Sequence, residues 1–165
     1  MGRAARWIRL PSETQADFDR TCDALAAAQV GDAAPMVLWA SIEERHAFAI
    51  VLPLRHAPGR RSRWAAWALS PAVAAYRRAG LPAYLEGESI CLHGRRIERG
   101  ASRAVGGCAV VSAGFMRRFP AEPFLESLFR GCIEAQHGWE FETSWPSREE
   151  RAALQGEMLE ATLLR

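Results

Sequence analysis

Two apolar segments, residues 35–41 and 46–52, lie on either side of a short charged turn at residues 43–45. Segments of this length that are rich in Val, Ile, Leu, Phe and Trp are typical of β-strands. A connection this short joins only antiparallel strands, because parallel strands need a long crossover. The segments therefore predict a β-hairpin, and a hairpin needs further strands or helices to bury its apolar surface.

Helical patterns flank the hairpin, after a short first strand at residues 7–10. Residues 12–15 (Ser-Glu-Thr-Gln) fit a capping box at the start of a helix that ends near residues 30–32. Its apolar face contains Phe18, Cys22, Leu25 and Ala26. Residues 64–79 predict a second helix, with a start or a bend at Ser70-Pro71 and an end at Gly80.

Short strands are predicted in the middle of the chain, at residues 83–86, 88–92 and 95–97. His93-Gly94 suits a two-residue turn between the last two of these strands. The Gly-Gly pair at 106–107 leads into a further strand at residues 108–115, whose small and β-branched side chains suit burial.

The C-terminal third predicts two helices. Residues 124–133 give the most regular amphipathic pattern, and Gly138 ends that helix. A second capping box at 147–150 opens the last helix, with Leu154, Met158 and Ala161 facing inward. The order of elements predicts one α+β domain, residues 1–165, with a mostly antiparallel mixed sheet and helices packed on one face.

All basic residues of the chain are arginines, and this excludes several chemistries. The 21 arginines against 19 acids give a net charge of +2, which does not indicate a nucleic-acid partner. Because there is no lysine, a Schiff-base lysine and a phosphate-loop lysine are excluded. The four cysteines contain no Cys-x-x-Cys pair, so no metal site is predicted. Neither a signal peptide nor a membrane span is present, so we expect a cytoplasmic protein.

Three segments carry a resemblance to a known family. A strand ending in Leu-Pro (AIVLPL, 49–54) precedes an Ala-rich helix that ends in Ala-Gly-Leu (79–81), and GESICLHGRRI (87–97) resembles a strand running into a Gly-Arg-Lys-Ile motif. FLESLFRGCIEAQHGWEFETSWPSREERAAL (124–154) is similar to the tail of lipoate ligase domains. Together they resemble the catalytic domain of the biotin and lipoate protein ligase superfamily, whose fold is like that of class II synthetases. The resemblance leaves open whether this domain is truncated relative to the family.

The resemblance implies an enzyme that holds an acyl-adenylate and passes the acyl group to a lysine of a carrier protein. In that family a loop rich in glycine and arginine wraps the phosphates, and the lysine of Gly-Arg-Lys stabilises the adenylate. The present sequence departs from both features, because GDAAPMVLWAS (31–41) lacks such a loop and Arg96 replaces the lysine. Gly100 stands one position later than the small residue of the family. Adenylate formation is therefore not expected.

The resemblance singles out candidate ligand-binding residues, each with a structural alternative. Arg95 and Arg96, after Gly94, are either anion contacts or solvated arginines of a turn, with one expected to point inward. Trp39 belongs either to the floor of a pocket or to the core. Cys108 is either a thiol paired with His93 for acyl transfer or an inert buried residue. With Gly100, the candidate set is Trp39, Gly94, Arg95, Arg96, Gly100 and Cys108.

A basic loop at residues 55–63, with Arg55, Arg60, Arg61 and Arg63, is either a phosphate-binding segment or a solvated loop. The leading hypothesis is a degenerate ligase-like domain that binds a small acyl or carboxylate ligand, or a biotinyl or lipoyl carrier protein. Alternatives are an atypical lipoyl or octanoyl acyltransferase and a structural partner protein that kept only the fold. The sequence identifies no cofactor, and no membrane partner is expected.

Overall fold

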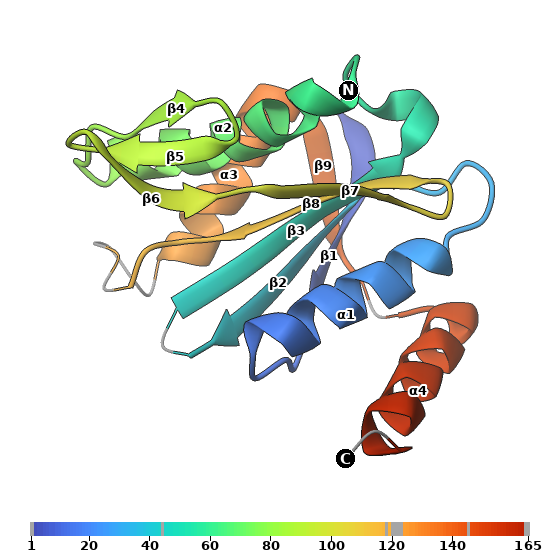
Figure 1. Cartoon of the computed structure of the whole chain (residues 1–165). Helices are drawn as coiled ribbons and strands as arrows, with labels where there is room; N and C mark the ends of the chain where they lie inside the picture. Colours follow the sequence, from blue (N-terminus) through green and yellow to red (C-terminus); the bar gives the residue numbers. More distant parts are fainter. Residues whose placement is uncertain (1, 44, 118, 120–123, 145, 164–165) are drawn as a thin grey trace.

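A six-stranded mixed sheet forms the centre of the molecule (Figure 1). The computed structural model describes residues 2–43, 45–117, 119, 124–144 and 146–163, with side chains as far as residue 156. The strand order is β7-β8-β3-β2-β1-β9. These strands are β1 (Arg3–Arg9), β2 (Met36–Ile42), β3 (Arg45–Pro53), β7 (Ala101–Val105), β8 (Cys108–Gly114) and β9 (Trp139–Thr143).

The predicted hairpin is confirmed as β2 and β3, which pair antiparallel with Trp39 opposite Phe48. β8 and then β7 extend the antiparallel part of the sheet. On the other side, β1 runs parallel to both β2 and β9. The α+β class and the mixed sheet are therefore confirmed.

Helices cover both faces of the sheet, which corrects the prediction that they pack on one. On one face α1 (Gln15–Ala27) covers alternate residues of the central strands, such as Leu38 and Ala49. On the other face α2 (Trp64–Arg78) and α3 (Leu125–His137) cover the intervening residues, such as Val37 and Ile50. The reason lies in the unbroken apolar runs of β2 and β3, which place apolar side chains on both faces.

A second, three-stranded sheet packs against α2. It consists of β4 (Tyr84–Glu86), β5 (Ser89–Leu92) and β6 (Arg95–Arg99), each antiparallel to the next. His93 (φ 51°) and Gly94 (φ 76°) both have left-handed backbone conformations, as expected for the predicted two-residue turn. After β6 the chain passes through Gly100 directly into β7 of the main sheet (Figure 1).

Two short 3₁₀ helices, Leu54–His56 (η1) and Arg61–Arg63 (η2), lie in the basic loop. α2 continues through Pro71 without a new start there. α1 is capped by Thr14, whose hydroxyl accepts a hydrogen bond from the Asp17 N–H, so the prediction of a cap at Ser12 is wrong. Strands β7 and β9 were not predicted. No helix in the described residues is both long and apolar enough to span a membrane.

The second capping box is confirmed at the start of α4 (Arg148–Leu163). The Glu150 N–H donates to the Ser147 hydroxyl at 3.2 Å, and the Ser147 N–H donates to Glu150 Oε1 at 3.4 Å. Leu154 packs on the α1 side of the sheet, whereas the side chains of Met158 and Ala161 lie outside the described part.

Glu150 also links α4 to the main sheet. Its Oε1 lies 2.7 Å from Arg6 Nη1 on β1, and only 4% of the Glu150 side chain is exposed. A charge this well buried needs its partner, because an unpaired buried charge is strongly unfavourable.

Replacing Glu150 with alanine removes the carboxylate that accepts the Ser147 N–H in the capping box and also removes the buried partner of Arg6. We expect Glu150→Ala to lower the free energy of unfolding by about 2–4 kcal/mol, measured by urea denaturation. The exposed neighbour in Glu149→Ala is the control, with an expected loss below about 1 kcal/mol. Equal losses in the two variants would contradict the role of Glu150.

His137, in the last turn of α3, is held in its neutral form. Its ring stacks on Trp67, with centroids 4.0 Å apart and planes at 15°. Burial lowers the pKa of His137 to about 4. Its Nε2 is buried without a hydrogen-bond partner among the described residues.

Because its folded-state pKa is depressed, His137 takes up a proton more readily in the unfolded chain. Stability is therefore lost as the pH falls from about 6.5 toward about 4. Allowing for partial exposure, we expect this residue to account for about 1–2 kcal/mol of that loss. In His137→Phe, which keeps the stacking on Trp67, urea denaturation should show a correspondingly flatter pH dependence over this range. An unchanged profile would contradict this assignment.

Candidate functional site

The candidate residues from the sequence lie in separate places. Trp39 is 3% exposed in the core between the main sheet and the α2–α3 layer. Its ring stacks on His46 with centroids 5.2 Å apart and packs against Phe129 at 5.9 Å. The structure thus places Trp39 in the aromatic core.

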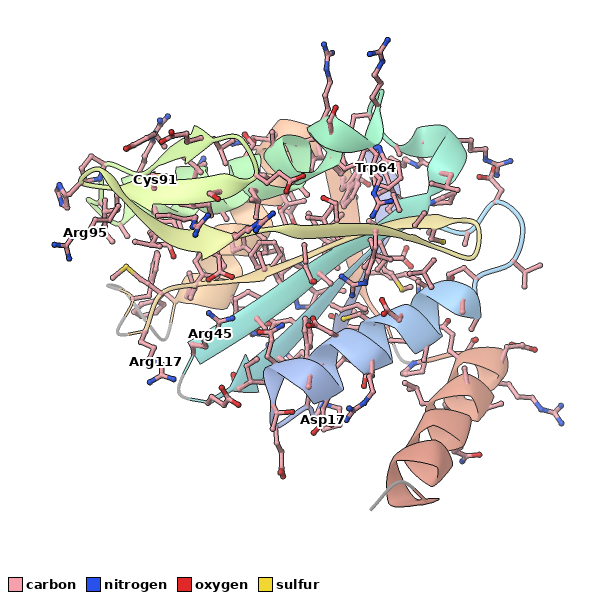
Figure 2. All side chains as sticks on the ribbon, in the orientation of Figure 1. Asp17, Arg45, Trp64, Cys91, Arg95 and Arg117 are labelled. Atoms are coloured by element: carbon pink, nitrogen blue, oxygen red, sulfur yellow. The ribbon has the colours of Figure 1, made fainter. Side chains whose placement is uncertain are left out.

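Gly94, Arg95 and Arg96 lie at the turn between β5 and β6. Both arginine side chains are exposed, so neither points inward as the alternation suggests. Gly94 and Arg96 line an open hollow on the small sheet with Glu86, Ser89 and Cys91. Figure 2 shows Arg95 and Cys91 at this outer end of the small sheet.

Gly100 is buried against α2. A Cβ at this position would lie 3.0 Å from Leu69 Cδ1 and 3.5 Å from Ala65 Cβ. Its N–H donates to the Glu88 carbonyl at 2.8 Å. The absence of a side chain lets the β6–β7 bend approach the helix closely.

Cys108 lies on the opposite face of the main sheet from Trp39. It is 3% exposed in the core that α1 covers, and burial raises the pKa of its thiol. His93 belongs to an exposed turn of the small sheet, so the structure does not form the Cys108–His93 pair. The environment of Cys108 favours an unreactive thiol.

A polar cavity lies where β3 and β6 meet the end of β8, near the start of α1. Its volume is about 460 Å³. Figure 2 shows Arg45 and Arg117 at this end of the molecule. The lining combines guanidinium, amide and carboxylate groups with two partly buried apolar side chains, and consists of Gln15, Glu43, Arg45, Ile97, Met116 and Arg117.

Arg45 is held rigidly beside this cavity. Its Nη1 lies 3.1 Å from Glu98 Oε2, and its Nη2 donates to Gln15 Oε1 at 2.8 Å. Glu98 Oε1 in turn accepts the Gly114 N–H at 3.0 Å. A Cβ on Gly114 would lie 3.0 Å from Arg45 Cζ, so the guanidinium lies against bare backbone.

Glu98, the partner of Arg45, is mostly buried and does not itself line the cavity. Its side chain is 10% exposed, and desolvation raises the pKa of Glu98 despite the opposing effect of Arg45. Nearby, Tyr76 accepts the Met116 N–H at 2.8 Å, and burial raises the pKa of Tyr76 to about 12. A neutral Tyr76 hydroxyl therefore fixes the backbone that precedes Arg117.

The space between the sheet and the α2–α3 layer is filled by aromatic rings. Phe48 and Phe129 have centroids 4.5 Å apart, and Phe115 lies 5.1 Å from Phe129 and 5.5 Å from Tyr76. These rings occupy volume that an acyl chain entering this layer would need. The cavity beside Arg45 is therefore confined to the end of the sheet.

The sequence pattern did not single out Arg45, Glu98 or Arg117. Arg45 was read as part of a turn, although it opens β3. The ion-pair partners are 53 residues apart, and they meet only because β6 lies beside β8. One feature of the sequence could have indicated this pair. Arg45 and Glu98 stand beside apolar strand segments, where an unpaired charge is rare.

The described residues contain no cluster of histidine, cysteine and acidic side chains suited to a metal ion. In the cavity beside Arg45, Arg117 is the group suited to an anion, because Arg45 is paired with Glu98 and Glu43 is itself a carboxylate. A guanidinium group binds a carboxylate through paired hydrogen bonds. Ile97 and Met116 provide apolar contacts beside these charges.

Comparison with known proteins supports the resemblance seen in the sequence. No protein-family model matches the chain, and no curated protein matches it. A bi-partite lipoate protein ligase from Thermoplasma acidophilum, described with its E2 lipoyl domain, has a similar structure with a TM-score of 0.77. The sequences are 9% identical, and the match covers 93% of this chain and 91% of that chain.

Two further structures show the same similarity. Lipoate-protein ligase A bound with ATP matches with a TM-score of 0.74 and 9% identity, over 93% of both chains. The biotin acetyl coenzyme A carboxylase synthetase of Helicobacter pylori, with bound biotinylated ATP, matches with a TM-score of 0.54 and 14% identity, over 96% of this chain and 81% of that one. The chain therefore has the fold of the biotin and lipoate protein ligases.

Proposed function

We propose that this chain is a ligase-like domain that binds a small carboxylate-bearing acyl ligand without activating it as an adenylate. The observation that supports this proposal is the cavity at the end of the sheet, where Arg117 lies beside Gln15, Glu43 and two apolar side chains, and where Arg45 is paired with Glu98. A ligand carboxylate contacts the Arg117 guanidinium, and a short acyl chain contacts Ile97 and Met116.

The positions of the charged groups are the reason that we expect no activation of the ligand as an adenylate. The chain has no lysine, and Arg96, at the position of the family's motif lysine, is exposed on the small sheet. A developing negative charge on an adenylate needs a preorganised cation beside it. Arg45 does not replace this cation, since it is already paired with Glu98.

The aromatic filling of the α2–α3 layer favours a second candidate, a structural partner that kept the fold and binds a biotinyl or lipoyl carrier protein. Rings from Trp39, Phe48, Phe115 and Phe129 pack against one another in this layer. The acyltransferase alternative has less support, because the Cys108 thiol is buried and its pKa is raised.

Calorimetric titration with octanoate, lipoate and biotin tests the carboxylate site. We expect saturable binding of at least one of them and at least a roughly tenfold weaker affinity in Arg117→Ala, whose exposed side chain makes unfolding of the variant unexpected. Arg96→Ala removes the same charge from the small sheet and should bind as the parent does. A loss confined to Arg96→Ala would move the site to the Gly-Arg-Arg turn and contradict the proposal. Binding of an apo lipoyl domain without binding of any free acid would support the structural partner instead.

Incubation with ATP, free biotin or lipoate and an apo carrier domain tests the absence of activation. We expect no modified carrier by mass spectrometry, with an active lipoate ligase as the positive control in the same assay. The reason is the missing cation at the adenylate. Modified carrier formed by the purified chain would overturn the proposal.

A further inference from the structure

A second cavity lies where β6 bends into β7, beside the start of α2. Its volume is about 440 Å³. It is separate from the carboxylate cavity and shares no lining residue with it. The lining consists of Arg61, Glu88, Arg99, Gly100, Ala101 and Ser102.

Positive charge predominates at this cavity. Arg61 Nη2 donates to the Ser102 carbonyl at 2.9 Å, which leaves other donors of the same guanidinium for a ligand. Arg99 Nη2 lies 3.7 Å from Glu88 Oε2, and the Arg99 side chain is 68% exposed, so this ion pair is weak. Arg60 and Arg63 flank Arg61 in the sequence and add to the local positive potential.

Two buried polar groups at this corner have no hydrogen-bond partner within the described part of the chain. One is the hydroxyl of Ser102, a residue that lines the cavity. The other is the indole N–H of Trp64, the first residue of α2 (Figure 2). Unpaired buried polar atoms are unfavourable and rare in native proteins, and a bound ligand atom removes this cost for the hydroxyl that lines the cavity.

The start of α2 also favours an anion. The N-cap is Arg63, which makes no side-chain cap hydrogen bond, and the first turn contains no acid, while the Trp64 N–H donates to the Arg61 carbonyl of the preceding 3₁₀ helix. The N-terminal end of a helix carries partial positive charge, so negative charge nearby is stabilised. This effect adds to that of Arg61 and Arg99.

We propose that this cavity binds a phosphate group. The guanidinium groups of Arg61 and Arg99 contact its oxygens, and the Ser102 hydroxyl donates a further hydrogen bond. This binding is independent of the carboxylate site and gives a role to the basic loop at residues 55–63.

Glu88 determines which oxyanion the cavity accepts. Its carboxylate lines the cavity and repels an anion that has no proton to donate. Hydrogen phosphate keeps a proton at neutral pH and donates it to Glu88 in a hydrogen bond, whereas sulfate does not. A phosphate monoester has lost most of its last proton at pH 7, because its second pKa is about 6. The cavity therefore prefers free phosphate, and it accepts a monoester better at pH 6 than at pH 8.

Calorimetric titration of the full chain with inorganic phosphate, sodium sulfate and glycerol 3-phosphate tests the site. We expect saturable phosphate binding, at least about tenfold weaker in Arg61→Ala and several-fold weaker in Ser102→Ala. The matched control is Arg60→Ala, which removes the same charge from the same loop but not from the cavity, and should change the affinity by less than about twofold. In Glu88→Gln, we expect sulfate to bind nearly as well as phosphate.

Other outcomes would overturn the proposal. One such outcome is the absence of saturable phosphate binding up to about 10 mM. Another is an equal loss of phosphate affinity in Arg61→Ala and Arg60→Ala, which would indicate diffuse electrostatic attraction such as that for a nucleic acid. Equal affinity of the parent for sulfate and phosphate would refute the role of Glu88. Arg117→Ala should leave phosphate binding unchanged, so a failure at either cavity is distinguishable from a failure at the other.

Discussion

The burial of both faces of β2, β3 and β8 determines the rest of the architecture. Alternate residues of these strands enter two different cores, with Leu38 and Val110 on the α1 side and Val37 and Val111 on the α2–α3 side. A sheet that is apolar on both faces needs two helical layers, and α1 with α4 and α2 with α3 supply them. Once both layers are packed with side chains, polar groups are left to the ends and bends of the strands. Both cavities described here lie at such places.

The pair formed by Arg45 and Glu98 joins the small sheet to the main one. It links the first residue of β3 to β6, and the Gly114 N–H holds the second carboxylate oxygen. Desolvation and the guanidinium act on Glu98 in opposite directions, and the raised pKa shows that desolvation is the larger effect. The same geometry that stabilises the junction places Arg45 at the rim of a cavity.

Local patterns in the sequence predicted the elements that bury a regular apolar face, namely the β2–β3 hairpin and α3. Local patterns did not predict the elements whose stabilising partner lies far away in the sequence. β9 pairs with β1, so that Arg3 lies opposite Trp139, and the sequence of neither strand by itself predicts this pairing. β7 is short and rich in small residues. The continuous apolar run of β2 implies burial on both faces, whereas the order of elements predicts helices on one face only. The candidate site was harder to predict from the sequence than the fold, because Arg45 meets Glu98 only after both sheets have formed.

Gly100 packs against Leu69 and also lies at the end of a stretch that borders both cavities. The stretch from Ile97 to Gly100 borders one cavity through its first residue and the other through its last two. One strand of the small sheet therefore forms part of the wall of both cavities.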